Sequence, residues 1–304
     1  NTKLITSDYY AYLGAIRQFS NRNTSYINVL ATPGIDYVNQ KQLVTEVANM
    51  IEDEDDRNKD CIYIVTTPDK PFGAGDDVLS MYTPLDAVIN LEDSELNSSC
   101  IASYYPWVKY YDQNNSQYIF LPATKDVVRA IAYTDRIAQP WYAAAGWNRG
   151  DINAEGPRKK LKNNEQDKLY EGRLNFIYSF AEEETDKLWG DKNFQIADTI
   201  TNRLSKRRAL IKIKQRLQNA GITLLFDPND AQMAKSFETA VRAVMDKIVT
   251  DRGCSDYKLK VDHSLEAIDR LEINGTLYIQ LNPNTEYINL ALVSTPQGFS
   301  LGEV

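Results

Sequence analysis

The chain has a single histidine, His263, which follows an aspartate in the stretch Val261-Asp262-His263-Ser264. A Ser–His–Asp hydrolase would need this imidazole as its general base. The sequence lacks the Gly-x-Ser-x-Gly motif that presents the nucleophile of an α/β hydrolase. We therefore expect His263 to be structural, and we keep an α/β hydrolase-like enzyme as the alternative from another class. One histidine and scattered cysteines also predict that the chain has no metal site.

Two further patterns could carry chemistry, but each has a simpler explanation. Residues 72–77 (FGAGDD) form a glycine-containing loop before an expected helix, yet they lack the Gly-Lys-Ser/Thr of a phosphate-binding loop. The two aspartates in this loop would repel phosphate, so we expect a turn with a helix N-cap and no bound cofactor. The carboxylate runs at 52–56 and 182–184 are typical of solvated faces.

The region from Thr199 to Phe226 departs from the acidic balance of the chain, because it contains basic but no acidic side chains. We expect it to form a long helix over residues 199–219 that is closed by Gly221. Its basic residues are Arg203, Lys206, Arg207, Arg208, Lys212, Lys214 and Arg216. Helical spacing places Arg208, Lys212 and Arg216 on one stripe. This stripe is a solvated face, a docking site for an acidic partner or a nucleic-acid contact.

The first half of the chain alternates between strand-like and helical patterns. Apolar runs predict strands at 26–31, 61–65, 100–111 and 118–121, the first of which stops at Thr32-Pro33-Gly34. Helical spacing predicts helices at 7–19, 39–54, 76–90 and 122–138. This alternation predicts an α/β fold with a mainly parallel sheet and flanking helices.

The second half predicts an α+β arrangement. We expect a basic loop at 156–168, short strands at 173–180 and 187–189, and a helix that Asp230 caps and that runs to about residue 251. Strand-like pieces follow at 257–261, 276–281 and 287–294, and the last two could form a hairpin. A terminal strand of this kind either completes its own sheet or adds to the sheet edge of a neighbour.

The composition sets limits on the class of protein. The chain has 304 residues, of which 43% are hydrophobic, and this is enough for one large or two ordinary domains. A net charge of −8 argues against general nucleic-acid binding. No apolar run is long enough to span a membrane. Cys61, Cys100 and Cys254 are expected to be free buried thiols. Tyrosine outnumbers phenylalanine, 19 to 9, which fits either subunit contacts or a tyrosine-rich core.

The segment 140–150 (PWYAAAGWNRG) sits between a helical pattern and the second half of the chain. Two tryptophans and a tyrosine beside proline, alanines and glycines suit neither a surface helix nor an alternating strand. We expect a buried, irregular joint in which Trp141, Trp147, Asn148 and Arg149 hold the two halves rigidly together.

An ordered set of motifs resembles the contractile tail sheath proteins of myophages, and the resemblance covers about residues 26–295. The most specific match is residues 140–152 (PWYAAAGWNRGDI). The other matching segments are 26–34 (YINVLATPG), 61–68 (CIYIVTTP), 169–180 (LYEGRLNFIYSF), 226–230 (FDPND) and 282–290 (NPNTEYINL).

The resemblance implies a subtilisin-like α/β sheath domain, partial over residues 1–155, followed by a C-terminal sheath domain with a terminal strand arm over residues 156–304. It also implies a structural protein without catalysis. Family members carry a long N-terminal part, so we expect this chain to be the C-terminal part of a longer protein. A sheath from a bacterial contractile injection particle is the alternative within the same class.

The same resemblance implies assembly partners rather than a ligand. Sheath subunits stack as hexameric rings around a tail tube, contract to drive the tube through the host envelope, and meet baseplate and tail terminator proteins. This implies a homo-oligomer in the virion, assembled in the host cytoplasm, without nucleic acid or membrane insertion. The basic residues Arg203, Lys206, Arg207, Arg208, Lys212 and Arg216 become candidates for a surface facing the tube. The candidates for an inter-subunit strand are Thr276, Tyr278, Gln280, Tyr287, Asn289, Ala291 and Val293.

Overall fold

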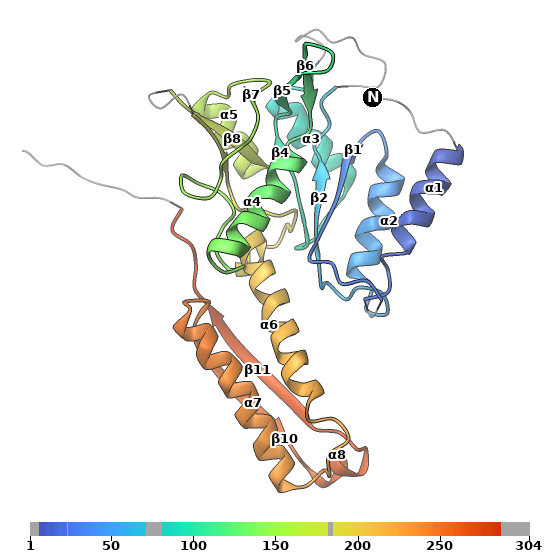
Figure 1. The fold of residues 1–304 in the computed structure, drawn as a ribbon, viewed down its shortest axis with the longest axis vertical. Helices are drawn as coiled ribbons and strands as arrows, with labels where there is room; N and C mark the ends of the chain where they lie inside the picture. The colour runs from blue at the N-terminus through green and yellow to red at the C-terminus, as the bar shows by residue number, and fades with distance from the viewer. Residues whose placement is uncertain (1–5, 23, 71–80, 182–184, 287–304) are drawn as a thin grey trace, which may run out of the picture.

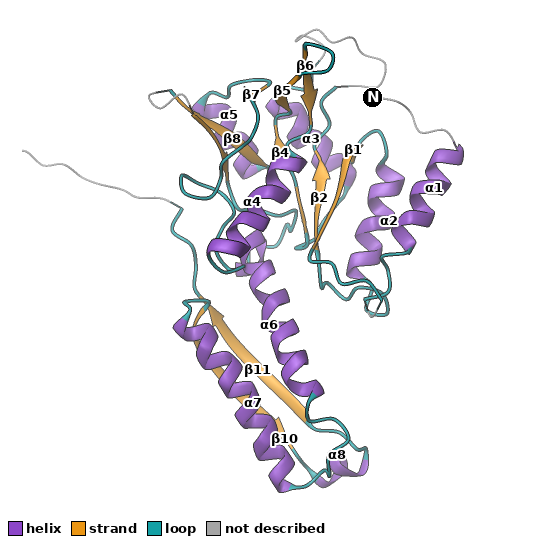
Figure 2. Cartoon of the chain, in the orientation of Figure 1, coloured by secondary structure: helices purple, strands orange, loops and turns teal. Residues whose placement is uncertain are grey.

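The structure is a computed structural model that describes residues 6–22, 24–70, 81–181 and 185–286. These residues form a larger body (residues 6–203) and a distal lobe (residues 204–281) that extends away from it along α6 (Leu204–Ile222) (Figure 1). Helices and strands alternate through the body, which confirms the predicted mixed α/β class (Figure 2).

The centre of the body is a parallel sheet in the order β1-β2-β3. Its strands are β1 (Val29–Asp36), β2 (Ile62–Thr66) and β3 (Ile101–Ala102). Alternate side chains of β2 enter two different cores, Tyr63 and Val65 on one face and Ile62 and Ile64 on the other. The first face is covered by α1 (Thr6–Arg17), α2 (Lys41–Glu52) and α3 (Pro84–Ser94), and the second by α4 (Thr124–Ile137).

Two smaller sheets complete the body. In one, β4 (Tyr104–Tyr105) pairs parallel with β8 (Asn175–Phe180), which pairs antiparallel with β9 (Thr185–Trp189). In the other, β5 (Val108–Asp112) pairs antiparallel with both β6 (Gln117–Leu121) and β7 (Gly156–Pro157). The described strands therefore form four small sheets, and only the central one is wholly parallel, which corrects the expectation of a mainly parallel sheet.

Several predicted boundaries are wrong for local reasons. The strand expected over 100–111 is divided among three sheets, and one break falls at Pro106, which has no N–H for a ladder. β1 runs through Thr32-Pro33-Gly34, because an irregular register with Gly34 at φ +86° absorbs the turn residues. The expected loop at 156–168 contains β7 and the start of α5 (Asn163–Glu171).

Other differences concern helix ends. α3 begins at Pro84 rather than near residue 76, because Thr83 and Asp86 cap each other's backbone N–H groups. The loop predicted at 72–77 lies outside the described residues. A short 3₁₀ turn, η2 (Ile200–Asn202), precedes α6, and α6 continues through Gly221 to Ile222.

The distal lobe is a helical layer against a two-stranded sheet. Its elements after α6 are α7 (Ala231–Thr250), β10 (Cys254–Asp262), α8 (Leu265–Asp269) and β11 (Asn274–Leu281). Asp230 caps α7 as predicted, since its carboxylate accepts a hydrogen bond from the Met233 backbone N–H at 2.8 Å. β10 and β11 pair antiparallel from one end to the other, with a register irregularity between Cys254 and Asp256. The expected partner strand at 287–294 lies outside the described residues.

The hydrophobic cores of the body and of the distal lobe meet along the first half of α6, where Leu204 and Ile211 belong to a body core and Ala209 and Ile213 belong to the distal core. Residues on both sides of position 155 share the two cores of the body, for example Tyr63 with Leu169 and Ile64 with Leu188. A third core fills the distal lobe. The cores therefore do not separate at the predicted domain boundary between residues 155 and 156. That boundary stays a prediction that rests on the family resemblance. All three cysteines are free and buried, as expected. Among the described residues, no helix is long and apolar enough to cross a membrane.

Candidate functional site

Trp141 joins the body to the distal lobe. It lies just after α4, its side chain is buried, and it belongs to the distal core with Met245 and Ile248. Its indole N–H donates to the backbone carbonyl of Asp251 at 3.0 Å. A Cβ atom on Gly253 would come within 3.0 Å of the indole, so this position needs glycine for the ring to approach. These contacts fix the end of α4 to the loop between α7 and β10.

Trp147 differs from the prediction of a fully buried joint, because its side chain is 46% exposed. Its ring packs edge-on against Phe180 at 5.0 Å, and the ammonium of Lys187 lies 5.0 Å from its centre. Asn148 is exposed, whereas Arg149 donates from Nε to the backbone carbonyl of Ala143 at 2.9 Å. The segment is irregular as predicted, but Trp141 is the aromatic anchor and Trp147 lies at its rim.

Asp191 is the centre of a buried polar network at the start of α6. One carboxylate oxygen accepts from the Ser205 backbone N–H at 3.0 Å, and the other accepts from the Ser205 hydroxyl and, at 3.3 Å, from the side-chain amide of Asn284. The ammonium of Lys206 donates to Asn284 Oδ1 at 2.6 Å and to the Trp141 carbonyl at 3.3 Å. Burial raises the pKa of Asp191 and lowers the pKa of Lys206, although each charge opposes the shift of the other.

The segment after β11, residues 283–286, returns from the distal lobe to the body, and we call it the strap. Glu286 accepts two hydrogen bonds from the Arg203 guanidinium and one from the Tyr170 hydroxyl at 2.5 Å. Burial would raise the pKa of Glu286, but the hydrogen bonds from Arg203 and Tyr170 and the charge of Arg203 outweigh it and hold the pKa below its ordinary value. With Asn284 in the Asp191 network, the strap is tied to the body at two points.

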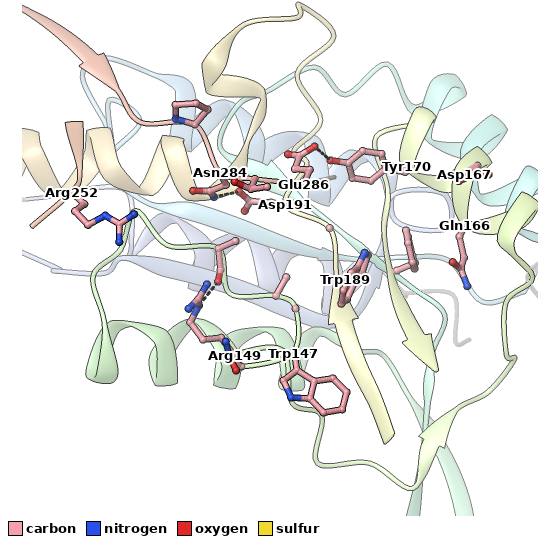
Figure 3. A pocket seen from close by; sticks show the side chains of 18 residues that line it. Trp147, Arg149, Gln166, Asp167, Tyr170, Trp189, Asp191, Arg252, Asn284 and Glu286 are labelled. Carbon is pink, nitrogen blue, oxygen red and sulfur yellow. Dashed lines mark hydrogen bonds between the residues drawn. The ribbon is translucent and has the colours of Figure 1, made fainter. Parts of the chain in front are cut away.

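A cavity of about 530 Å³ lies beside the strap, between it and the segment around Trp147. Figure 3 shows Glu286 meeting Tyr170, and Asn284 meeting Asp191, with Trp147 and Arg149 across the opening. Aromatic rings and charged groups of both signs line this space. Among the described residues, no group of His, Cys, Asp or Glu could hold a metal ion.

The basic helix is used largely inside the chain, which corrects the expectation of an exposed stripe. Lys206 and Arg208 are buried, and Arg208 forms an ion pair with Asp135 of α4. Arg216 donates to Gln139 at 3.1 Å and lies over the Trp141 ring. The long basic side chains thus bridge α6 to the body.

The remaining basic residues of α6 are more open. Lys212 is half-buried and forms no hydrogen bond or ion pair with any part of the chain that the structure describes. Arg207 and Lys214 donate to the backbone carbonyls of Lys59 and Asn58 at 3.0 and 3.1 Å, and neither has a carboxylate partner among the described side chains. Arg203 is committed to Glu286.

The described candidates for an inter-subunit strand share one face of β11. Thr276, Tyr278 and Gln280 are exposed, whereas Leu277, Ile279 and Leu281 point into the distal core. Tyr287, Asn289, Ala291 and Val293 lie outside the described residues.

His263 lies at the far end of the distal lobe, after β10. Its Nε2 is 3.0 Å from Asn229 Oδ1, and the neighbouring Asp262 accepts from the Ser264 backbone N–H at 3.1 Å instead of from the imidazole. In the described part of the chain, the ring therefore has an amide partner that ties two loops together.

Sequence reasoning missed the acceptors that organise the junction, namely Asp191 and Glu286, and their partners Tyr170 and Asn284. Each lies far along the chain from the groups that it binds, so no local spacing reveals the pairing. One signal was present, because Asn284 and Glu286 belong to the family-like stretch 282–290.

No family model matches the chain, but two curated proteins are similar to it in sequence. The tail sheath protein of Vibrio phage KVP40 is 27% identical over 282 residues, covering 87% of this chain and 40% of that protein. The tail sheath protein of Enterobacteria phage T4 is 26% identical over 261 residues, covering 82% of this chain and 39% of that protein. The chain thus spans about two fifths of the length of these relatives.

Solved structures agree in fold. The chain is similar to the baseplate structure of the anti-feeding prophage, with a TM-score of 0.72, 17% identity, and coverage of 97% of this chain and 75% of that one. The contracted sheath of an extracellular contractile injection system gives a TM-score of 0.70 at 15% identity, with coverage of 92% and 75%. The chain is thus similar in sequence to two phage tail sheath proteins and similar in fold to contractile sheath and baseplate structures.

Proposed function

We propose that the chain is the C-terminal part of a structural sheath subunit, which polymerises as hexameric rings around a tail tube and contracts to drive the tube through a host envelope. The observation that carries this proposal is the similarity to two phage tail sheath proteins over more than four fifths of the chain. In this proposal, residues 1–155 correspond to a subtilisin-like sheath domain, and residues 156–304 correspond to the C-terminal domain. The subunit acts in the virion, after assembly in the host cytoplasm.

The construction of the junction supports a mechanical role. A subunit that moves within a lattice has to transmit force between its parts without deforming. Trp141, the Asp191 network and the Glu286–Arg203 pair tie the distal lobe to the body from three sides. The exposed outer residues of β11, with Thr276, Tyr278 and Gln280, are available to contact a neighbouring subunit.

The partners of the proposed subunit are identical sheath subunits, a tail tube protein, and baseplate and tail terminator proteins. Structural neighbours come from a helical sheath and from a baseplate, which supports contacts with identical subunits and with a baseplate. Lys212, half-buried and without a partner among the described residues, is the strongest remaining candidate of the basic stripe for a tube contact.

A bacterial contractile injection particle is the second candidate, since one structural neighbour described above is the sheath of an extracellular contractile injection system. The sequence relatives are phage proteins, and this favours a phage tail. The hydrolase alternative has less support, because the imidazole of His263 has an amide partner at the distal end of the molecule. Catalysis is not part of the proposed role.

Electron microscopy tests the proposal. A protein that carries this chain together with the preceding part found in its relatives is expected to form tubes or stacked rings, alone or with a purified tail tube. A protein that stays monomeric at high concentration in both conditions contradicts the proposed function. Lys212→Glu is expected to reduce sedimentation of the subunit with purified tubes, whereas Lys247→Glu on α7, where Lys247 lies on an exposed turn, is the control that leaves it unchanged.

A further inference from the structure

The far end of the distal lobe carries an unusual set of exposed apolar side chains. It consists of the loop between α6 and α7 and the segment around α8, and we call it the distal tip (Figure 1). The exposed fractions are 63% for Ile222, 62% for Leu225, 102% for Phe226, 79% for Leu265 and 87% for Leu271. Connecting loops are normally polar, and apolar side chains gathered at one exposed place mark an interaction surface.

Two of these five residues have a strained backbone. Phe226 has φ +72° and Leu271 has φ +60°, a left-handed conformation that is costly for residues other than glycine, asparagine and aspartate. The two loops are fixed to each other, because the Asn229 side chain contacts His263 at 3.0 Å and donates to the Glu272 carbonyl at 3.3 Å. The tip is therefore a single built surface rather than two independent loops.

The tip is also acidic. Six carboxylates surround the apolar side chains and one arginine opposes them. The acidic residues are Asp227, Asp230, Asp262, Glu266, Asp269 and Glu272, and the arginine is Arg270. A partner for this surface needs an apolar floor and a basic rim.

A groove of that kind lies on this same chain, on the other side of α6 from α4. It has a volume of about 380 Å³, and its apolar floor includes Leu210, Leu217 and Ile279. Lys59, Arg207 and Lys214 form its basic rim, in which the Lys59 ammonium is already paired with Glu52 at 3.0 Å. Burial and the charges of Arg22 and Arg207 lower the pKa of Lys214, opposed by the charge of Asp60. Arg207 and Lys214 donate only to backbone carbonyls among the described residues, so neither charge is neutralised by a carboxylate in direct contact.

We infer that the distal tip of one copy docks into this groove of a second copy, with Phe226 on the apolar floor and the tip carboxylates on the basic rim. The tip lies beyond the end of α6 while the groove lies along it, so the continuous helix keeps a tip out of its own groove. Two different surfaces meet in this contact, and such a head-to-tail interface adds subunits into an open polymer. The inference rests on the proposed role as a subunit of a polymer.

Sedimentation velocity of the 304-residue chain over a range of concentrations tests this contact. The wild-type chain is expected to form larger species as its concentration rises, and added salt should weaken them. Phe226→Asp in the tip and Lys214→Glu in the groove should each weaken self-association at least about tenfold, because each removes one side of the interface. Lys214→Met, which keeps the apolar stem, should have a smaller effect and guards against a folding defect. Ile196→Asp, at a position 66% exposed on the body, is the matched control and should associate like the wild type.

Mixing the two variants gives the sharpest result. The Phe226→Asp chain keeps a working groove and the Lys214→Glu chain keeps a working tip, so an equal mixture should form heterodimers and nothing larger. A mixture that stays monomeric, a wild-type chain that is monomeric throughout, or a Phe226→Asp chain that associates normally overturns the inference. A tip variant that associates normally but loses binding to purified tubes would assign the tip to the tube. Tubes formed by the longer protein would still support the proposed function in each of these cases.

Discussion

The junction around Trp141 and the distal tip around Phe226 both place a large aromatic residue in an irregular connection. At the junction, the aromatic ring is buried, its N–H has an acceptor, and nearby charges are paired. At the tip, the ring is fully exposed on a left-handed backbone among carboxylates. The contrast separates two uses of an aromatic side chain, since Trp141 stabilises the subunit itself, whereas Phe226 is left exposed and is the residue that we infer to contact a second copy.

The largest expected effect is at Trp141. Trp141→Ala should lower the free energy of unfolding by about 3–5 kcal/mol, because it empties a buried site and removes a hydrogen bond to the Asp251 carbonyl. Trp147→Ala is the matched control and should cost about 1 kcal/mol, since nearly half of that side chain is exposed. Chemical denaturation of both variants measures the difference. Equal losses would mean that the two tryptophans share the junction, as the sequence suggests.

Asp191 gives the next largest effect. Asp191→Asn should destabilise the chain by about 1.5–3 kcal/mol, because an amide nitrogen would face the Ser205 donors and Lys206 would lose its nearest negative charge. Asp167→Asn removes an exposed carboxylate from the wall of the same cavity and should be nearly neutral. Thermal unfolding of the two variants tests this prediction. Similar losses of stability in both variants would show that the buried network around Asp191 adds no more stability than an exposed carboxylate.

Glu286 makes the strap sensitive to acid. The pKa of Glu286 is held below its ordinary value of 4.5 in the folded chain, so its contribution is fully present above pH 4.5 and is lost as the pH falls through the folded pKa. Glu286→Gln should cost about 1–2 kcal/mol at neutral pH and less in acid, so the two stability curves converge. Denaturation at several pH values measures this. The raised pKa of Asp191 gives a slope of opposite sign in both proteins, so it cancels from the comparison. Parallel curves would contradict the assignment.

Phe226 should show the smallest effect on folding. Phe226→Ala is expected to change the free energy of unfolding by less than about 0.5 kcal/mol, because the side chain makes almost no contact within the subunit. Denaturation under dilute conditions isolates the single chain. A loss of several kcal/mol would mean that Phe226 is part of the fold, and the contrast with Trp141 would disappear.

Sequence patterns predicted the elements well where the information is local. The Asp230 cap, the buried run of β2 and the long helix α6 follow from neighbouring residues, and the structure confirms them. The division of residues 100–111 among three sheets depends on partners such as β8 and β7, which come much later in the chain. Periodicity cannot supply that information.

The same limit applies to the site. A basic stripe on α6 was visible in the sequence, but the acidic and carbonyl partners that bury Arg208 and occupy Arg207 come from distant residues. Trp141 and Trp147 have similar sequence neighbourhoods, and only the packing of the distal core distinguishes them. The family-like motif at residues 140–152 identified the segment that joins the two parts of the molecule. The roles of its individual residues became clear only from their contacts in the folded structure.

The uninterrupted course of α6 makes the subunit a lever. Its 19 residues correspond to a rod of about 28 Å, anchored in the body at one end and carrying the tip at the other. If the body tilts by about 10°, a rod of that length displaces its free end by about 5 Å, which is close to the rise of one helical turn. A small reorientation of the body would therefore become a displacement large enough to exchange one set of side-chain contacts for another at the tip.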